Sequence, residues 1–371
     1  QQCYNITVLN NTFESNNIRA RLPSSRRTRP DAPGLGNNTF GIGLNNVTYS
    51  TITNNTGFQN IFGLRLQQSD FNTIRTNLFQ GTLGYGISLS HSRDNMISEN
   101  ELWRFYGQAG FYFSDSEAYY NEIKNNLVNL ELYYHYVNEH DFSLENLNLN
   151  AASVSNIGKI SFISCSNFTL HNASLNNNHY GAGLFLYDSH NNSVSGVDTS
   201  NNAYGIWLNA SGHNDINLIS NHRDGIGTWI DGATKSGIRG NNVTSVVATN
   251  CSTGIQFDTV TDNTVSNVIT SHNLYGLSIN QSSHNTFSHI NGSNNKYGIY
   301  ANLSGDNTFS LINISDAKYA IKFDFAYNNN LSHLNLSHND YGVFFSTWSA
   351  FNNVSKSRIV DSTYHVYMEF N

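Results

Sequence analysis

Four related segments follow one another near the end of the chain: Tyr275-Gly276-Leu277-Ser278-Ile279, Tyr297-Gly298-Ile299-Tyr300, Tyr319-Ala320-Ile321-Lys322-Phe323 and Tyr341-Gly342-Val343-Phe344-Phe345. The second residue of each segment lies 22 positions after that of the segment before it. The register continues backward, at spacings mostly of 22 to 24, through Gly254, Gly227, Gly205, Gly181, Gly158, Gly110, Gly86, Gly63 and Gly41. A period of this length over most of the chain indicates a repeat protein.

Apolar residues alternate with polar ones inside each repeat. Ile299, Ala301 and Leu303 alternate with exposed positions, and Phe309 and Leu311 open a second apolar segment after a polar turn. Such short alternating runs are typical of strands, and a 22-residue unit has no room for a helix beside them. We therefore expect an all-β protein: a right-handed single-stranded parallel β-helix of about 14 coils of roughly 22 residues, forming one domain over residues 1–371.

Two columns of like residues support this arrangement. An asparagine stands nine residues after the coil glycine, where it suits the left-handed backbone region and can join an amide ladder between coils: Asn72, Asn95, Asn167, Asn214, Asn263, Asn285, Asn307 and Asn329. A tyrosine precedes the glycine and would stack on its neighbours: Tyr85, Tyr180, Tyr204, Tyr275, Tyr297, Tyr319 and Tyr341.

Composition restricts the function. Charged residues are only 12% of the chain, but 22 Phe and 21 Tyr supply core material that disordered chains lack. The net charge of −7 differs from the basic character of most nucleic-acid-binding proteins. The sequence has no run of 18 apolar residues that would predict a transmembrane helix. The sequence opens on Gln1-Gln2-Cys3, which fits a processed N-terminus or a segment of a longer chain. We expect an extracellular or cell-surface protein.

The cysteines form no disulfide framework. Cys165 and Cys251 lie about four coils apart, at ~4.8 Å per coil, which exceeds the reach of a disulfide. We expect both to be buried thiols, and Cys3 is left as a candidate for pairing between chains.

The repeat resembles the parallel β-helix repeat family, in particular NosD-like repeats of archaeal surface glycoproteins. Units such as Tyr297-Gly298-Ile299-Tyr300 followed by Asp306-Asn307-Thr308-Phe309-Ser310 carry the resemblance, which covers roughly residues 40–365. The family includes polysaccharide lyases, hydrolases, epimerases and structural proteins. The resemblance therefore implies the fold more strongly than the function.

Eighteen Asn-x-Ser/Thr motifs predict N-glycosylation: Asn5, Asn10, Asn37, Asn46, Asn54, Asn167, Asn172, Asn191, Asn209, Asn242, Asn250, Asn280, Asn291, Asn302, Asn313, Asn330, Asn335 and Asn353. Several keep a constant phase next to predicted turns, where a glycan can project into solvent. The stretch between Asn54 and Asn167 has no such motif.

The stretch without glycosylation motifs is rich in aromatic residues, from Trp103 to Tyr136. It is either a contact surface for a sugar or a neighbouring subunit, or a set of broader coils with aromatic side chains inside. It also carries Arg104, Asp115, Glu117, Glu131, His135, Glu139, His140 and Asp141, from which paired carboxylates could hydrolyse a glycosidic bond.

Enzyme motifs expected from the family are absent from the sequence. Adjacent aspartates, Gly-His-Gly and Asp-Pro-His do not occur, and the only prolines are Pro23, Pro30 and Pro33. No dense acidic cluster suggests a calcium site, and the fourteen histidines are scattered, with His135 and His140 the nearest pair. We therefore expect no catalytic residue, metal or cofactor.

An insertion at 18–36 interrupts the repeat and must leave the solenoid as a loop. It contains all three prolines and five arginines that could dock an acidic glycan or a neighbouring subunit: Arg19, Arg21, Arg26, Arg27 and Arg29. A simply solvated loop is the alternative.

The two ends of the repeat suggest self-assembly. The chain begins after the position of a first strand and finishes on one, so each end offers a strand edge. We expect the last strand of one copy to complete the first coil of the next, through Val366, Tyr367, Met368 and Phe370 against Ile6 and Val8. The sequence thus favours a structural envelope glycoprotein, of an S-layer, sheath or filament. The alternative is a carbohydrate-active or carbohydrate-binding β-helix protein.

Overall fold

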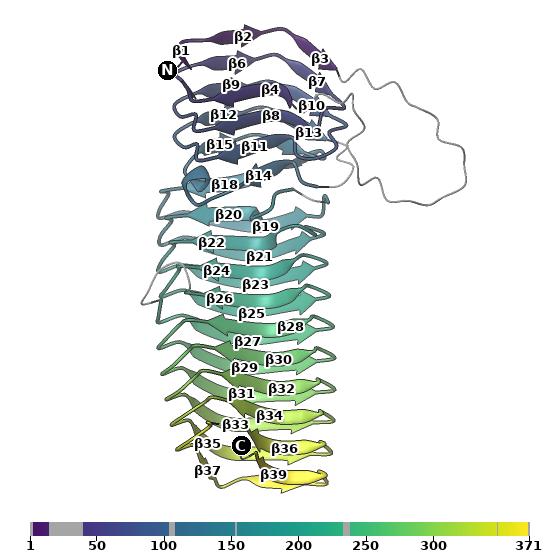
Figure 1. Cartoon of the computed structure of the whole chain (residues 1–371), viewed down its shortest axis with the longest axis vertical. Coiled ribbons are helices and arrows are strands. Elements are labelled where there is room, and N and C mark those ends of the chain that lie inside the picture. Colours follow the sequence, from purple (N-terminus) through teal and green to yellow (C-terminus); the bar gives the residue numbers. More distant parts are fainter. Residues whose placement is uncertain are drawn as a thin grey trace, which may run out of the picture. The chain divides into compact units, whose positions relative to one another are not determined.

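The computed structural model describes residues 3–14, 40–103, 108–152, 154–232, 238–346 and 348–369. It shows an all-β parallel solenoid of about 14 turns set about 22 residues apart, which confirms the predicted right-handed β-helix (Figure 1). The chain forms two compact units: unit 1 is Gln1–Val137 with Ala151–Ile157, and unit 2 is Asn138–Asn150 with Gly158–Asn371. The single domain over residues 1–371 stays a prediction, and the insertion at 18–36 lies outside the described residues.

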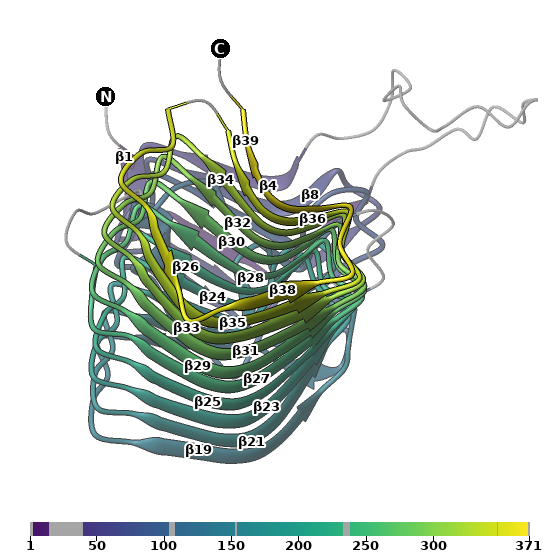
Figure 2. The ribbon, with the colours of Figure 1, turned by 90° about the horizontal axis from the view of Figure 1, so that it is seen from below.

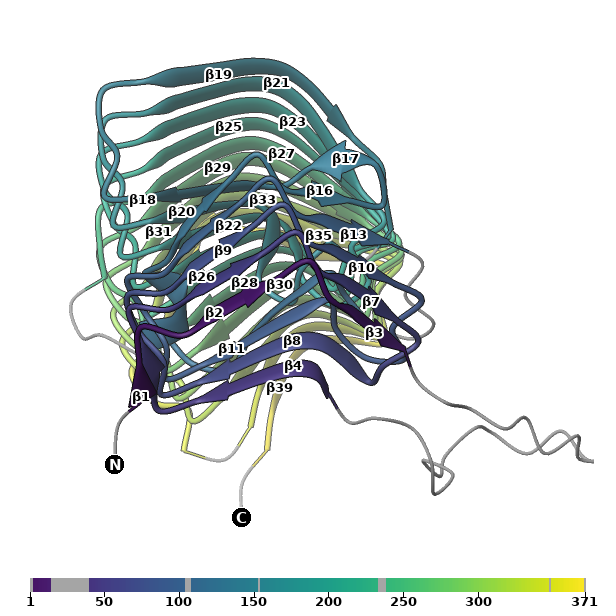
Figure 3. The same ribbon diagram turned by 90° about the horizontal axis from the view of Figure 1, so that it is seen from above.

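Unit 1 is built from short strands stacked in parallel sheets. One sheet runs in the order β14 (Phe111–Phe113), β11 (Ile87–Ser90), β8 (Phe62–Gln67) and β4 (Phe40–Asn45). Figure 3 shows β11, β8 and β4 one after another along one face of the unit. A second sheet contains β15 (Glu122–Lys124), β12 (Met96–Ser98), β9 (Thr73–Arg75), β6 (Thr51–Thr53) and β2 (Thr7–Leu9).

The third sheet of unit 1 contains β17 (Glu131–Leu132), β16 (Leu127–Val128), β13 (Glu101–Trp103), β10 (Leu78–Gln80), β7 (Thr56–Phe58) and β3 (Thr12–Glu14). Only β17 is antiparallel to its neighbour among these strands. The remaining elements of unit 1 are β1 (Cys3–Tyr4), which pairs with β5 (Val47–Thr48), the 3-10 helix η1 (Glu117–Tyr119), and β18 (Tyr134–Val137).

Each coil of unit 2 has one short and one long strand (Figure 2). The short strands are β20 (Gly158–Ile163), β22 (Ala182–Tyr187), β24 (Tyr204–Asn209), β26 (Ile226–Asp231), β28 (Thr253–Asp258), β30 (Tyr275–Asn280), β32 (Tyr297–Asn302), β34 (Tyr319–Asp324), β36 (Tyr341–Phe345) and β39 (Tyr364–Met368). The long strands are β19 (Ser143–Leu149), β21 (Thr169–Asn176), β23 (Ser193–Ser200), β25 (Asp215–His222), β27 (Asn242–Thr249), β29 (Thr264–Ser271), β31 (Thr286–Ser293), β33 (Thr308–Ser315) and β35 (Asn330–Ser337), followed by β37 (Asn353–Ser355) and β38 (Arg358–Val360).

The corners of the coils are residues with positive φ. In one coil of unit 2 these are Leu303, Asp306, Leu311 and Asp316, with φ between 50° and 56°. Leu311 lies in the middle of β33, so the long strand bends there and continues as a second segment. Asn, Asp and His, which tolerate left-handed backbone best among non-glycine residues, hold more than half of the described corners, and other types such as Leu303 and Leu311 adopt it at the rest.

The predicted amide ladder is confirmed. The coils use asparagine here for its side-chain hydrogen bonds and not, as expected, for its tolerance of left-handed backbone. Asn285 and Asn307 are both 1% exposed, and each passes its hydrogen bonds to the next coil. The left-handed residue is the one just before each, such as His284 or Asp306. Asn167 is wrongly placed by the sequence: it is itself a left-handed, exposed corner, and Phe168 takes the ladder position.

The glycine column is set by close contact between coils. A Cβ on Gly276 would lie 2.6 Å from the carbonyl oxygen of Gly298. Gly158 and Gly181 do not belong to this column, because Gly158 pairs with Ala182 and the glycine facing Gly205 is Gly183.

The predicted tyrosine stack is confirmed over the last coils of unit 2. Ring centroids are 4.8 to 5.1 Å apart from Tyr275 through Tyr297 and Tyr319 to Tyr341. Tyr180 is wrongly placed in this column, because it lies in the turn before β22, where Ala182 holds the position.

Candidate functional site

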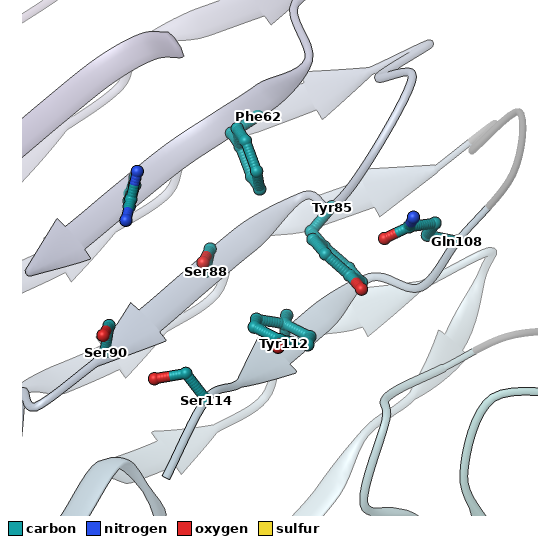
Figure 4. A pocket seen from close by; sticks show the side chains of 8 residues that line it. Phe62, Tyr85, Ser88, Ser90, Gln108, Tyr112 and Ser114 are labelled. Carbon is teal, nitrogen blue, oxygen red and sulfur yellow. The ribbon is translucent and has the colours of Figure 1, made fainter. Parts of the chain in front are cut away.

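The groove on the outer face of the β14-β11-β8-β4 sheet is the candidate site. Its volume is about 430 Å³, within the range of small-molecule sites. Adjacent strands supply its lining: Phe62, Arg65, Tyr85, Ser88, Ser90, Gln108, Tyr112 and Ser114. Figure 4 shows Phe62, Tyr85 and Tyr112 one after another, with Ser88, Ser90 and Ser114 along their side.

Strand register explains why these side chains meet. Arg65, Ser88 and Tyr112 are direct partners on β8, β11 and β14, so all three point outward from the same row. Their neighbours Leu64, Ile87 and Phe111 point inward and are completely buried. The period-two alternation of each strand therefore separates a solid core from a polar and aromatic outer face.

Aromatic rings form one wall of this groove. Tyr85 stacks on Tyr112 with centroids 4.3 Å apart, and Phe62 lies 5.9 Å from Tyr85. Phe40 continues the row at 5.4 Å from Phe62, and the Arg65 guanidinium lies 5.3 Å from the Phe40 ring centroid. This cation–π contact limits the positions open to the long Arg65 side chain.

Two polar groups of the groove have free hydrogen-bonding capacity within the described chain. Ser88 is only 4% exposed, and its hydroxyl bonds to no other described residue. The Oε1 atom of Gln108 is buried and accepts no hydrogen bond from the described residues. A buried polar atom without a partner is costly, so Oε1 of Gln108 is suited to a donor group of a polar ligand, and the Ser88 hydroxyl is available beside it.

His91 and Asp115 lie at the serine end of the groove, where the His91 backbone N–H donates to Asp115 Oδ2 at 2.9 Å. His91 Nδ1 is 3.4 Å from Asp115 Oδ2 and 3.2 Å from Ser90 Oγ, and Ser114 Oγ donates to Asp115. Burial alone would raise the pKa of Asp115, but hydrogen bonds from Ser114, His91 and Ala118 outweigh it and hold that pKa below its usual value. Asp115 is therefore an ionised partner that orients His91.

These residues are not a serine-protease triad. Ser90 and Asp115 both approach Nδ1 of His91, whereas a triad needs the serine on one ring nitrogen and the carboxylate on the other.

Part of the aromatic stretch around residues 103–136 lies inside the core: Phe111, Phe113 and Tyr133 are buried. Phe111 stacks on Tyr133 at 4.9 Å, and Phe113 stacks on His135 at 5.4 Å. His135 is 4% exposed, and its Nε2 donates to the Tyr119 carbonyl at 2.8 Å. Burial lowers the pKa of His135 to about 4, so this residue is a neutral core histidine. Tyr112 is the member of the stretch that faces the groove, and Arg104 lies outside the described residues.

Glu139 and Asp141, two of the suggested carboxylates, lie at an exposed corner of unit 2, and neither lines the groove. Asp141 has φ 56° and bonds to His140 at 2.7 Å and to Asn167 at 3.2 Å. The His140 hydrogen bond, with that from Asn167, lowers the pKa of Asp141. Asp141 is thus a turn residue with local partners, and Glu117 and Glu131 do not line the groove either.

The three cysteines form no disulfide: Cys165 and Cys251 are buried, as expected, and Cys3 is exposed. Burial raises the pKa of both buried thiols, to about 12 for Cys251, where Asp224 adds a further increase. Protonated buried thiols are unreactive and poor metal ligands.

Most predicted glycosylation sites are exposed where the structure describes them: Asn5, Asn10, Asn46, Asn54, Asn167, Asn172, Asn191, Asn242, Asn250, Asn291, Asn313, Asn330, Asn335 and Asn353. Asn280 and Asn302 are half-buried. Asn209 is 6% exposed and its amide donates to Asp231, so its side chain would have to leave this position to accept a glycan. Asn37 lies outside the described residues, and glycosylation stays a prediction.

The described residues of the predicted assembly interface differ in exposure, because Tyr367 and Val8 are half-buried and the others are exposed. Val366 and Met368 of β39 are 47% and 56% exposed, and Ile6, beside β2, is 39% exposed. β39 pairs with β36, and β2 pairs with β6. Phe370 and the five docking arginines (Arg19, Arg21, Arg26, Arg27 and Arg29) lie outside the described residues.

A family model described as "Periplasmic copper-binding protein (NosD)" matches residues 1–130 and 216–371. No curated protein matches the sequence. Among the described residues no helix has the length and apolarity that crossing a bilayer as a helix requires.

Several solved structures are similar to this chain in fold. The Dettilon tailspike protein is 11% identical with a TM-score of 0.38, and the match covers 86% of this chain but only 62% of the tailspike chain. A mutant of the periplasmic alginate epimerase AlgG is 11% identical with a TM-score of 0.33, covering 98% and 84%. A hyperthermoactive exopolygalacturonase from Thermotoga maritima is 7% identical with a TM-score of 0.26, covering 90% and 83%.

The expectation that the chain is not an enzyme is corrected by these structures. An alginate epimerase and an exopolygalacturonase are among the proteins of similar fold. Sequence reasoning also missed the groove, because Arg65, Ser88 and Tyr112 lie on different coils.

Proposed function

This chain belongs to the NosD family, and we propose that it is an exported carbohydrate-binding β-helix protein whose ligand lies in the groove of unit 1. The observation that carries the proposal is the row Arg65, Ser88 and Tyr112, which places a cation, a hydroxyl and an aromatic ring side by side on adjacent strands. Ser88 is nearly buried and leaves its hydroxyl free for a ligand. Sugars need this combination of hydrogen-bonding groups and apolar surface.

The family description names copper, but the described side chains of this protein do not form a copper-binding site. Among the described residues no three His, Cys, Asp or Glu side chains come together as a metal site. Cys165 and Cys251 are buried and their thiol pKa values are raised, which disfavours the thiolate that copper would bind. The proposal therefore assigns copper no part.

Glycan-array binding followed by isothermal titration calorimetry tests the proposal. We expect the full chain to bind an oligosaccharide, and Tyr112→Ala to weaken binding roughly tenfold, because it removes a wall of the groove. The matched control is Tyr327→Ala, an exposed tyrosine of unit 2. No oligosaccharide binding, or equal affinity of Tyr112→Ala and the unchanged chain, would contradict the proposal.

A second candidate function is acid–base chemistry on the bound glycan. The specific observation is the His91–Asp115 pair, joined through Ser90 and Ser114 to the groove wall. Asp115 would hold His91 in one orientation while the imidazole takes or gives a proton. Mass spectrometry of oligosaccharides after incubation tests this: products that form with the unchanged chain and vanish with His91→Gln support it, and products that persist contradict it.

Assembly into an envelope layer or filament stays a separate prediction. The exposed apolar residues Val366 and Met368 on β39 support it, since exposed strand edges recruit pairing partners. The two proposals rest on different residues, because β39 belongs to unit 2 and the groove to unit 1.

A further inference from the structure

We propose that the groove of unit 1 selects glycans that carry a carboxylate, and that Arg65 binds this group. The inference rests on the proposed function, because it names the class of sugar that the groove takes. A uronate residue of an acidic polysaccharide has the required chemistry: a carboxylate beside several hydroxyls.

Among the described residues that line the groove, Arg65 has the only charged side chain. It forms no ion pair or hydrogen bond with another side chain in the described part of the chain. Its five N–H donors are therefore available to a ligand. Guanidinium and carboxylate match in a bidentate pair, which is shorter and stronger than a neutral hydrogen bond.

Phe40 fixes the position from which Arg65 acts. The guanidinium lies 5.3 Å from the Phe40 ring centroid, and Gly43, the partner of Arg65 on β4, has no side chain to compete for this space. A planar guanidinium held on an aromatic face loses less conformational freedom when it binds a carboxylate.

The row beyond Arg65 suits the hydroxyls of the same sugar. Ser88 is the direct partner of Arg65 on the next strand, and Tyr112 follows it. Adjacent strands are ~4.8 Å apart, so a carboxylate on Arg65 brings the rest of the sugar ring over Ser88.

No acidic side chain of the groove competes for Arg65. Asp115, the nearby carboxylate, already accepts bonds from Ser114 and from the N–H groups of His91 and Ala118. The protein as a whole carries a net charge of −7 and repels polyanions. Local attraction at Arg65 must therefore outweigh this repulsion, which makes the selectivity sensitive to salt.

The purely structural alternative is that Arg65 only covers Phe40. Substitution with Lys separates the two roles, because Lys keeps the charge and the aliphatic stem but not the bidentate fork. A packing role predicts no effect on binding for either Lys or Gln, provided the fold is intact.

Calorimetric titration of the full chain with oligogalacturonate and with its carboxyl-reduced, neutral form tests the inference. We expect the acidic form to bind the unchanged chain on the order of 10- to 100-fold more tightly than the neutral form. Arg65→Gln should lose this preference, Arg65→Lys should keep part of it, and the affinity for the neutral form should change less than about threefold. Arg75→Gln, which removes an exposed arginine of β9 outside the groove, is the matched control.

Each outcome has a separate meaning. Equal affinity of the unchanged chain for both sugars, or an undiminished preference in Arg65→Gln, overturns the inference and leaves the proposed function standing. Binding of neither sugar, with no other glycan bound on an array, overturns both. Thermal unfolding of each variant shows whether a loss of binding comes from a loss of fold; if Arg65→Gln unfolds, Arg65→Lys alone decides.

Discussion

The backbone N–H of Asn285 donates to Oδ1 of Asn307 at 2.9 Å, and the side-chain amide of Asn285 donates to the same atom at 3.2 Å. Asn307 repeats both bonds toward Asn329, and its own amide also reaches the carbonyl of Ser282. One side chain thus serves three coils. Each asparagine satisfies buried backbone groups that no strand pairing satisfies.

Replacing Asn307 with Ala should destabilise unit 2 by about 2–4 kcal/mol, because the N–H and amide of Asn285 lose a buried acceptor. The control is Asn291→Ala, which removes an exposed asparagine one coil away and should cost less than about 0.5 kcal/mol. Urea unfolding followed by circular dichroism measures both. Similar losses for the two variants would show that the ladder is not a source of stability.

His135 should make unit 1 sensitive to acid. Its pKa is about 4 in the folded chain against an ordinary value near 6.5, so the unfolded state binds the proton more readily. Stability is therefore complete above pH 6.5 and falls as the pH drops toward 4, by roughly 2–3 kcal/mol in total. His135→Gln should lose this part of the pH dependence in urea titrations at pH 7.5 and 4.5, and the exposed His91→Gln should keep it. An unchanged slope in His135→Gln would contradict the assignment.

Asp224 takes a ladder position in unit 2 and is 2% exposed. The Thr199 hydroxyl lies 2.7 Å from both Asn221 Oδ1 and Asp224 Oδ2, and a hydroxyl has one proton to donate. The Asn221 amide nitrogen is already directed to Thr228. The carboxyl of Asp224 must therefore carry the second proton. Burial raises its pKa to about 7, in agreement with this geometry.

Asp224→Asn should stabilise unit 2 at pH 7 by roughly 1–3 kcal/mol, because an amide donates to Thr199 without binding a proton. The folded pKa is raised, so the contribution of Asp224 is complete below about pH 4 and is lost as the pH rises through 7. The gain from Asp224→Asn should accordingly shrink at pH 4.5. A loss of stability at pH 7 in urea unfolding would show that the carboxyl is ionised and required.

Glycan occupancy should follow exposure and register. Asn291, Asn313 and Asn335 are direct partners on adjacent strands, ~4.8 Å apart, where neighbouring glycans would collide. In a host that performs N-glycosylation, we expect adjacent members of this row not to be modified on the same molecule, and Asn209 to remain bare. Intact-glycopeptide mass spectrometry measures this, and a modified Asn209 would contradict the burial argument.

Assembly should depend on the exposed face of β39. A lysine in place of Val366 adds a charge at a strand edge, which opposes pairing with another copy. We expect Val366→Lys to reduce polymer in sedimentation velocity, while Thr363→Lys, an exposed change outside the strand, leaves it unaltered. Equal polymer in both variants, or none in the unchanged chain, would remove the assembly prediction.

The period of the fold was predictable because Tyr275, Tyr297, Tyr319 and Tyr341 occupy the same position in four consecutive coils, where their rings stack. Asn167 and Gly181 were misplaced because coils of 24 residues shift the register locally. The ladder asparagines were predicted to be left-handed because asparagine tolerates that conformation. Their side-chain amides, and not their φ values, are what stabilise the coil.

The groove was harder to predict than the coils. Arg65 and Tyr112 are 47 positions apart in the sequence and become near neighbours only through the register of β8, β11 and β14. The available signal was a charged residue two positions after a coil glycine, in Gly63-Leu64-Arg65. His135 gave no signal at all, because a buried histidine and a surface one look alike in sequence.

The left-handed corners also determine how this molecule can change in evolution. Asn209 and its strand partner Asp231 are 22 residues apart, but Asp231 and its own partner Asp258 are 27 apart, so five extra residues enter one coil without altering the pairing on either side. A corner side chain touches little of the core, and the strands beyond it resume their register. Loops can therefore be gained or lost in a single coil. The surface changes in this way while the pairing of the strands stays the same.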